Sequence, residues 1–182
     1  MKKSAVLAIL AAAAMMTGCT SAEQVFDKNY VRGFSVEGEN GKAAVFSFYD
    51  ENVEPYSSFA GDLSAVKKEA ELGLGKTVFT GHTEIIVLGE CDYASVLEFM
   101  LNDWKVSPSC LVVYGGPLSA YIMETYGAEK LTDSVNHIIK QGKAPECDIV
   151  TVLGGLLSDE RSAEIPLIGE SGFVGTEIIS VK

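Results

Sequence analysis

The feature that most constrains the fold is a strand–helix–strand segment in the middle of the chain. Two short aliphatic runs, Glu84 to Leu88 and Leu111 to Tyr114, flank a stretch in which apolar residues recur with helical spacing. The recurring positions are Tyr93, Val96, Leu97, Met100, Leu101 and Trp104. This spacing is typical of an amphipathic helix, and Asp92 is expected to cap it. The segment therefore predicts a βαβ unit with two parallel, buried strands and a right-handed crossover.

A β-hairpin is predicted ahead of this unit. Residues 30–37 and 42–49 are rich in Val, Phe and Tyr, and they flank the pair Asn40-Gly41. An Asn-Gly pair between two such runs is a strong hairpin signal. Residues 50–59 are polar and interrupted by proline, and they are expected to form a loop.

Helices are predicted on both sides of the βαβ unit. They run from the cap Asp62 to about Leu72, from the Gly115-Gly116-Pro117 turn onward, from Lys130 to Gln141 and from Asp148 to Leu157. A last strand is expected from Gly175 to Val181. The predicted fold class is α+β, with an N-terminal β-hairpin, a βαβ core and a helical C-terminal half around a mixed sheet.

The amino terminus has the pattern of a secretory signal. Lys2 and Lys3 precede an apolar or small run, Ala5 to Met16, which closes on Met16-Thr17-Gly18-Cys19. A basic start, a short apolar region and small residues at the cut define such signals. A cysteine directly after the small pair makes the segment similar to a bacterial lipoprotein signal, in which Cys19 would receive a diacylglycerol. A transmembrane anchor is the alternative, but the run is shorter than the roughly 20 residues that a spanning helix needs.

These boundaries predict a signal peptide over residues 1–18, a lipidated tether over 19–29 and a single domain over 30–182. Removing the two lysines of the signal lowers the net charge from −11 to −13. Such a charge disfavours nucleic acid, whose phosphates are bound by Lys and Arg. It also disfavours adhesion to anionic lipid, so the acyl chains would have to supply the membrane attachment. The expected location is the extracytoplasmic face of the cell membrane.

Three cysteines remain after the signal, Cys91, Cys110 and Cys147. They are widely spaced and form no CxxC pair, so neither a zinc site nor a thioredoxin-like site is predicted. Cys110 begins an apolar run and is expected to behave as a small buried hydrophobe. We expect three unpaired thiols.

Residues 73–77, Gly-Leu-Gly-Lys-Thr, resemble the end of a phosphate-binding loop. That motif also needs a glycine at position 70 and a preceding strand. Ala70 stands there instead, and a helix is expected before it. The segment is therefore interpreted as a helix end followed by a strand start.

His82 and His137 are the two imidazole side chains of the chain. His137 is expected on a helix surface, and His82 at the entry of a buried strand, where a structural role is favoured over catalysis or metal binding. A hydrolase that uses His82 is the weakest of the alternatives, because no GxSxG, Cys/His or His/Glu arrangement accompanies it. No enzyme activity, catalytic residue, cofactor or metal is predicted.

The stretch from Val78-Phe79-Thr80-Gly81-His82 through Ile85-Ile86-Val87-Leu88-Gly89-Glu90 resembles a known family. It is followed by the helix that ends near Asn102-Asp103 and by the aliphatic run after Ser109. This order is similar to the N-terminal domain of the Ger(x)C spore germination lipoproteins, the C subunits of nutrient germinant receptors. Members of that family usually carry further domains after this one, so the chain resembles a short form of the family.

The resemblance implies a set of signature residues that we interpret as structural: Phe79, Gly81, His82, Gly89 and Glu90. It also implies a non-enzymatic, lipid-anchored component of a germinant receptor complex, with integral membrane receptor subunits as partners. The alternative is a solute-binding or envelope-binding lipoprotein without a role in germination.

Overall fold

The structure, a computed structural model, describes residues 28–181, which form an eight-stranded mixed sheet covered by helices. Hydrogen-bonded neighbours follow the order β3-β2-β1-β5-β6-β7-β8, and β4 pairs with β1 outside this order. The strands are β1 (Lys28–Glu37), β2 (Ala43–Phe48), β3 (Tyr56–Phe59), β4 (Thr77–Phe79), β5 (Ile85–Leu88), β6 (Leu111–Tyr114), β7 (Ser162–Gly169) and β8 (Gly172–Ser180). The predicted α+β class is confirmed.

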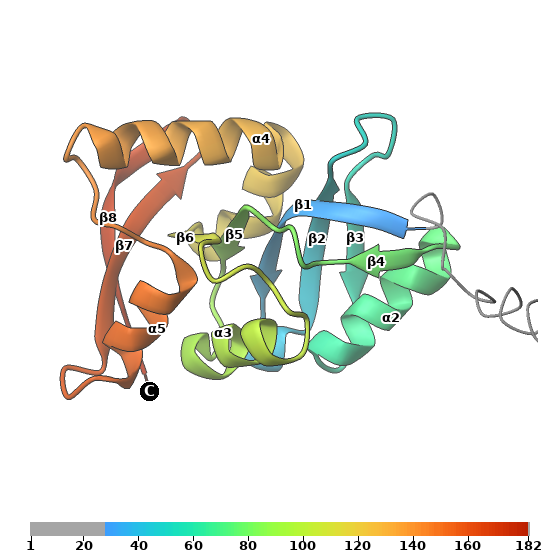
Figure 1. Ribbon diagram of the computed structural model, residues 1–182, viewed down its shortest axis with the longest axis horizontal. Helices are drawn as coiled ribbons and strands as arrows, with labels where there is room; N and C mark the ends of the chain where they lie inside the picture. The colour runs from blue at the N-terminus through green and yellow to red at the C-terminus, as the bar shows by residue number, and fades with distance from the viewer. Residues whose placement is uncertain (1–27, 182) are drawn as a thin grey trace, which may run out of the picture.

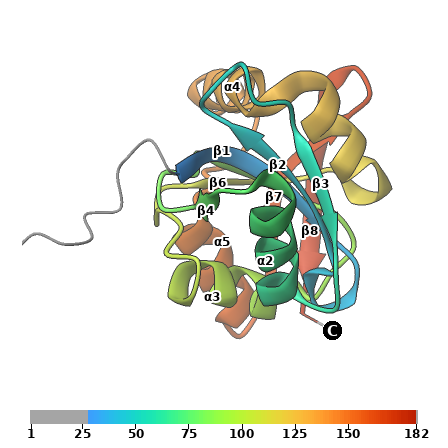
Figure 2. The ribbon, with the colours of Figure 1, turned by 90° about the vertical axis from the view of Figure 1, so that its right-hand side faces the viewer.

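The helices cover both faces of the sheet. They are α2 (Leu63–Leu74), α3 (Tyr93–Asn102), α4 (Ser119–Lys140) and α5 (Ile149–Leu157), with short 3-10 turns at Glu39–Gly41 and Gly116–Leu118. Helix α4 lies on one face, and α2, α3 and α5 lie on the other (Figures 1 and 2). The molecule therefore has three layers.

The predicted βαβ unit forms the centre of the sheet. Strands β5 and β6 are parallel, with Ile85 opposite Leu111, and all four residues of β5 are fully buried. Strand β1 runs parallel to β5 on its other side, with Gly33 opposite Ile85. Helix α3 begins after Asp92, whose side chain accepts a hydrogen bond from the backbone N–H of Ser95. Because β5 is covered on both faces, its sequence is continuously apolar rather than alternating.

The N-terminal hairpin is confirmed, but the loop predicted after it is wrong in its second half. Strand β2 is antiparallel to β1, and Asn40 and Gly41 both adopt positive φ angles in the connecting turn. Residues Tyr56–Phe59, expected in the loop, form β3 antiparallel to β2. Ser58 in this strand is buried, and its hydroxyl donates a hydrogen bond of 2.7 Å to the carbonyl of Val66 in α2. The serine therefore acts as an inward-facing residue, which its polarity hides in the sequence.

The C-terminal half contains a hairpin that the sequence showed only in part. Helix α5 lies where a helix is predicted from Asp148 to Leu157, and β7 then pairs with β8 in antiparallel register from Ser162 opposite Ser180. Strand β7 was not predicted because Pro166 lies in its middle. It shares one residue pair with β6, Tyr114 opposite Leu167, so most of its length is paired on the β8 side alone.

Helix α4 unites two helices that the sequence predicted separately. Its residue Gly127 has φ 69° and ψ 160°, values outside the helical range, and this residue kinks the helix. At α2, Asp62 caps the helix as predicted, but the helix continues to Leu74 before Gly75 ends it with a left-handed φ of 64°. Gly73 is therefore inside the helix.

The core is continuous from the sheet to both helical layers. Trp104 is buried as expected and packs against Phe34 and Phe46, with ring centroids 5.2 and 5.8 Å apart. Cys91, Cys110 and Cys147 are all buried.

Candidate functional site

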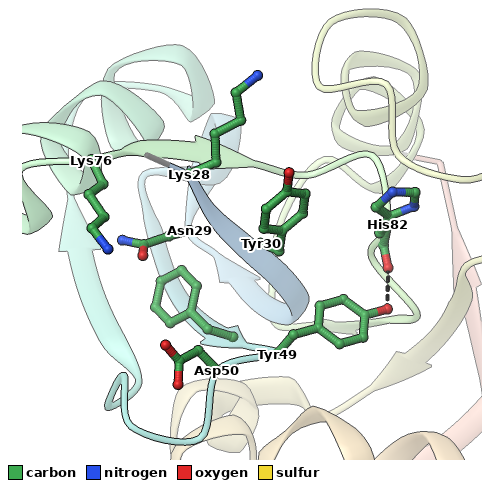
Figure 3. A pocket seen from close by; sticks show the side chains of 8 residues that line it. Lys28, Asn29, Tyr30, Tyr49, Asp50, Lys76 and His82 are labelled. Atoms are coloured by element: carbon green, nitrogen blue, oxygen red, sulfur yellow. Dashed lines mark hydrogen bonds between the residues drawn. The ribbon is translucent and has the colours of Figure 1, made fainter. Parts of the chain in front are cut away.

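A pocket lies beside the first residues of β1, and we call it the aromatic pocket (Figure 3). Its volume is about 570 Å³, which is within the range of small-molecule sites. The lining residues are Lys28, Asn29, Tyr30, Phe48, Tyr49, Asp50, Lys76 and His82. They come from β1, the end of β2, the α2–β4 connection and the turn before β5.

Strand pairing brings these segments together. The first residues of β1 pair in parallel with β4, so that Lys28 lies opposite Thr77 and Tyr30 opposite Phe79. On the β2 side, the backbone N–H of Tyr49 donates a 3.0 Å hydrogen bond to the carbonyl of Tyr30. The pocket is thus fixed to the sheet rather than to long loops.

The imidazole of His82 forms part of the pocket wall. It stacks on Tyr30 with ring centroids 6.3 Å apart and an interplanar angle of 20°, and it meets Phe79 edge-on at 5.4 Å. The carbonyl of His82 accepts a 2.8 Å hydrogen bond from the hydroxyl of Tyr49. A Cβ atom at Gly81 would lie 2.8 Å from Cζ of Phe79, so glycine leaves the room that this ring occupies. Three of the five signature residues, Phe79, Gly81 and His82, therefore belong to one packed unit.

An ion-pair network fixes Tyr49 at the rim of the pocket. Arg32 bonds to Glu84 through Nε at 3.0 Å and to Glu129 through a terminal nitrogen at 2.9 Å. The hydroxyl of Tyr49 donates a 3.0 Å hydrogen bond to Glu84, and the guanidinium carbon of Arg32 lies 5.3 Å from the centre of the tyrosine ring. Partial burial, together with the hydrogen bond to Glu84, raises the pKa of Tyr49 to about 12. Arg32 and Glu84 were not singled out from the sequence, because their partnership depends on β1 and β5 lying side by side.

The pocket carries charges of both signs. Lys28 lies with its ammonium 5.8 Å from the centre of the Phe79 ring, and the side chain of Lys76 is exposed. Asp50 accepts hydrogen bonds from the backbone and side-chain nitrogens of Asn52, at 3.0 and 2.9 Å. These bonds, together with the charge of Lys76, lower the pKa of Asp50. Asp50 and Lys76 therefore place opposite charges beside the same opening.

The other two signature residues, Gly89 and Glu90, lie at the opposite end of β5. The backbone N–H of Gly89 donates a 2.7 Å hydrogen bond to the carbonyl of Val36, and the carbonyl of Glu90 accepts one of 2.8 Å from Gly38. The carboxylate of Glu90 accepts a hydrogen bond from the hydroxyl of Tyr114. These contacts join the carboxyl ends of β1, β5 and β6, so the signature spans two separate places in the structure.

The remaining candidates do not assemble into a site with them. His137 is exposed near the end of α4, where its Nε2 lies 2.6 Å from the side-chain nitrogen of Gln141. Residues 73–77 are the end of α2 and the start of β4, as interpreted from the sequence. Among residues 28–181, no group of three or more His, Cys, Asp and Glu side chains is arranged to hold a metal ion.

Cys19 and the tether up to residue 27 lie outside the described residues. Lys28 and Asn29, which were expected in the tether, are the first residues of β1. Within the part of the chain that the structure describes, no helix has the length and apolar character needed to cross a bilayer. No protein-family model, curated protein or solved structure matches the chain.

Proposed function

We propose that this protein is a lipid-anchored, non-enzymatic component of a membrane complex on the extracytoplasmic face, of the kind formed by nutrient germinant receptors in spore-forming bacteria. The resemblance to the Ger(x)C lipoproteins supports the kind of complex, and the lipoprotein-like signal before Cys19 supports the lipid anchor. Integral membrane subunits are the proposed partners. The aromatic pocket is the proposed binding element.

The observation that carries this proposal is the position of the pocket beside the start of β1, the first strand of the sheet in chain order. Lys28 is both the first residue of β1 and part of the pocket lining. Residues 19–27 precede it, and a segment of that length spans at most about 30 Å when fully extended. A lipid on Cys19 would therefore hold the pocket near the bilayer and raise its effective concentration toward membrane partners.

The chemistry of the site supports binding rather than turnover. The His82 ring packs against the Tyr30 and Phe79 rings, and Tyr49, with its pKa near 12, keeps its proton at neutral pH. Burial also raises the pKa of the Cys110 and Cys147 thiols, so the nucleophilic thiolate is disfavoured.

Co-purification tests the proposal. The tagged wild-type chain would be crosslinked in intact cells, extracted from membranes with a mild detergent and analysed by mass spectrometry. We expect multispanning membrane proteins to accompany the wild type and to be lost from a Cys19→Ala variant, which lacks the acceptor thiol. Recovery of the wild-type chain without such partners would contradict the proposal.

The size of the pocket favours a second candidate, a solute-binding lipoprotein. A volume of about 570 Å³ accommodates an amino acid or a sugar. A thermal-shift screen with these solutes separates the two functions, because a ligand present at 100 times its Kd stabilises the native state by about 2.7 kcal/mol. A soluble nutrient that raises Tm, together with recovery of the chain alone from membranes, would favour this candidate.

A further inference from the structure

We propose that the aromatic pocket binds the headgroup of a zwitterionic phospholipid, one that carries a phosphate and an ammonium group. This inference rests on the lipid anchor of the proposed function and names a ligand for the same site. The pocket would then orient the domain on the bilayer, with the start of β1 toward the lipid.

The phosphate half of the headgroup is matched by lysines. The chain as a whole has a net charge of −11, yet two of the residues that line this one opening, Lys28 and Lys76, are lysines. Lysine binds phosphate as a compact point charge. The amide of Asn29 lines the same pocket and supplies a neutral hydrogen-bond donor.

The ammonium half is matched by Asp50. Its carboxylate is held by Asn52 and is close enough to Lys76 for their charges to interact. Figure 3 shows Lys76 and Asp50 on one side of the pocket and the rings of Tyr30 and His82 on the other. Opposite charges on one side and aromatic rings on the other suit a short zwitterion with a glycerol backbone.

The surroundings favour a zwitterionic lipid over an anionic one. Glu51 and Glu54 are exposed on the loop that follows Asp50, between β2 and β3. These carboxylates would repel an anionic bilayer surface that comes within about 8 Å, the screening length in physiological salt. A headgroup with its own ammonium group offsets that repulsion.

The first test uses a soluble headgroup. The mature lipidated protein in a non-ionic detergent would be titrated with glycerophosphoethanolamine by calorimetry, with inorganic phosphate as the comparison. We expect Lys76→Gln and Asp50→Asn each to weaken glycerophosphoethanolamine binding by about tenfold, since each removes a charged hydrogen-bonding partner. The matched controls Lys143→Gln and Asp159→Asn change exposed residues in loops after α4 and α5, and they should leave binding unchanged. Figure 1 places the end of α4 at the opposite end of the long axis from β4.

The second test uses the bilayer. The protein would be reconstituted in vesicles of phosphatidylethanolamine mixed with phosphatidylglycerol, or of phosphatidylglycerol alone, and followed by amide hydrogen exchange. Slower exchange at residues 28–30 and 48–50 in the mixed vesicles, lost in Asp50→Asn, supports the proposal.

Two results would overturn it: equal binding of inorganic phosphate and glycerophosphoethanolamine, or binding of the soluble probe without protection in mixed vesicles. The latter result would assign the pocket to a soluble zwitterion. Neither result alters the co-purification outcome, so the two proposals fail separately.

Discussion

At the scale of single residues, Gly89 shows how the carboxyl ends of β1 and β5 are held in contact. A Cβ atom at this position would lie 2.6 Å from Cβ of Glu37, 2.8 Å from Oγ of Ser119 and 3.2 Å from the carbonyl oxygen of Gly116. The hydroxyl of Ser119 also donates a 3.0 Å hydrogen bond to Glu37. Glycine is therefore required here for close packing.

Replacing Gly89 with Ala should lower the free energy of unfolding by about 1–3 kcal/mol, the cost of overpacking a close contact. The control is Gly61→Ala, since a Cβ there meets no atom within 4 Å and the residue has no positive φ. That variant should be neutral or slightly stabilising. Urea denaturation measures both, and equal stability of the two variants would refute the packing role of Gly89.

The buried thiol of Cys147 predicts a dependence of stability on alkaline pH. Burial raises its pKa from the ordinary 9.0 to about 12, with a hydrogen bond from the backbone of Val112 opposing the rise. Between these values the unfolded chain loses a proton that the native chain keeps. The stabilisation is therefore complete below pH 9 and declines as pH rises toward 12.

Urea denaturation at pH 8 and pH 10 checks this prediction. Between these pH values the wild type should lose about 1 kcal/mol more stability than Cys147→Ala, in which the group is absent. Val152→Ala is the control, because it shortens a side chain that is 1% exposed without removing a titrating group. It should lower stability by the same amount at both pH values, and equal pH slopes in all three proteins would contradict the assignment.

At the scale of elements, the kink of α4 depends on one residue. Gly127 has φ 69° and ψ 160°, a region open essentially to glycine alone. A Cβ atom at Gly127 would meet nothing within 4 Å. The backbone conformation, rather than lack of space, explains the glycine.

Gly127→Ala should therefore cost about 1–3 kcal/mol of unfolding free energy in an open site. Gly154, in α5, is equally open but has no positive φ, so Gly154→Ala should stabilise the protein by about 0.5–1 kcal/mol. Thermal unfolding followed by circular dichroism measures the pair. A neutral Gly127→Ala would show that α4 straightens without cost.

The sequence predicted helices and strands well where burial gives their apolar residues a regular spacing. It predicted them poorly where contacts with neighbouring elements determine the structure. The βαβ unit was predicted because β5, α3 and β6 each carry a local apolar pattern. Strand β3 is short, contains two serines and is stabilised through β2 and α2, so its pattern gives no strand signal. Strand β7 contains Pro166, and a proline argues against a strand in the interior of a sheet. Strand β7 tolerates it because it pairs with β6 at one residue only.

At the scale of the whole molecule, the sequence predicted His82 as a notable residue but not the pocket around it. The lining comes from four separate segments, at residues 28–30, 48–50, 76 and 82. The pocket exists because β1 pairs with both β4 and β2. No local sequence pattern predicts this strand pairing. The signature likewise reads as one motif in sequence, yet β5 separates it into two clusters.

We propose that lipid on Cys19 holds an acidic binding domain at the membrane with its pocket toward the bilayer. Metabolic labelling with radioactive palmitate is the decisive experiment, in which the wild type and Cys19→Ala are compared after membrane and soluble fractions are separated. We expect a labelled wild-type band in the membrane fraction and an unlabelled Cys19→Ala band. An unlabelled wild-type chain in the soluble fraction would contradict it.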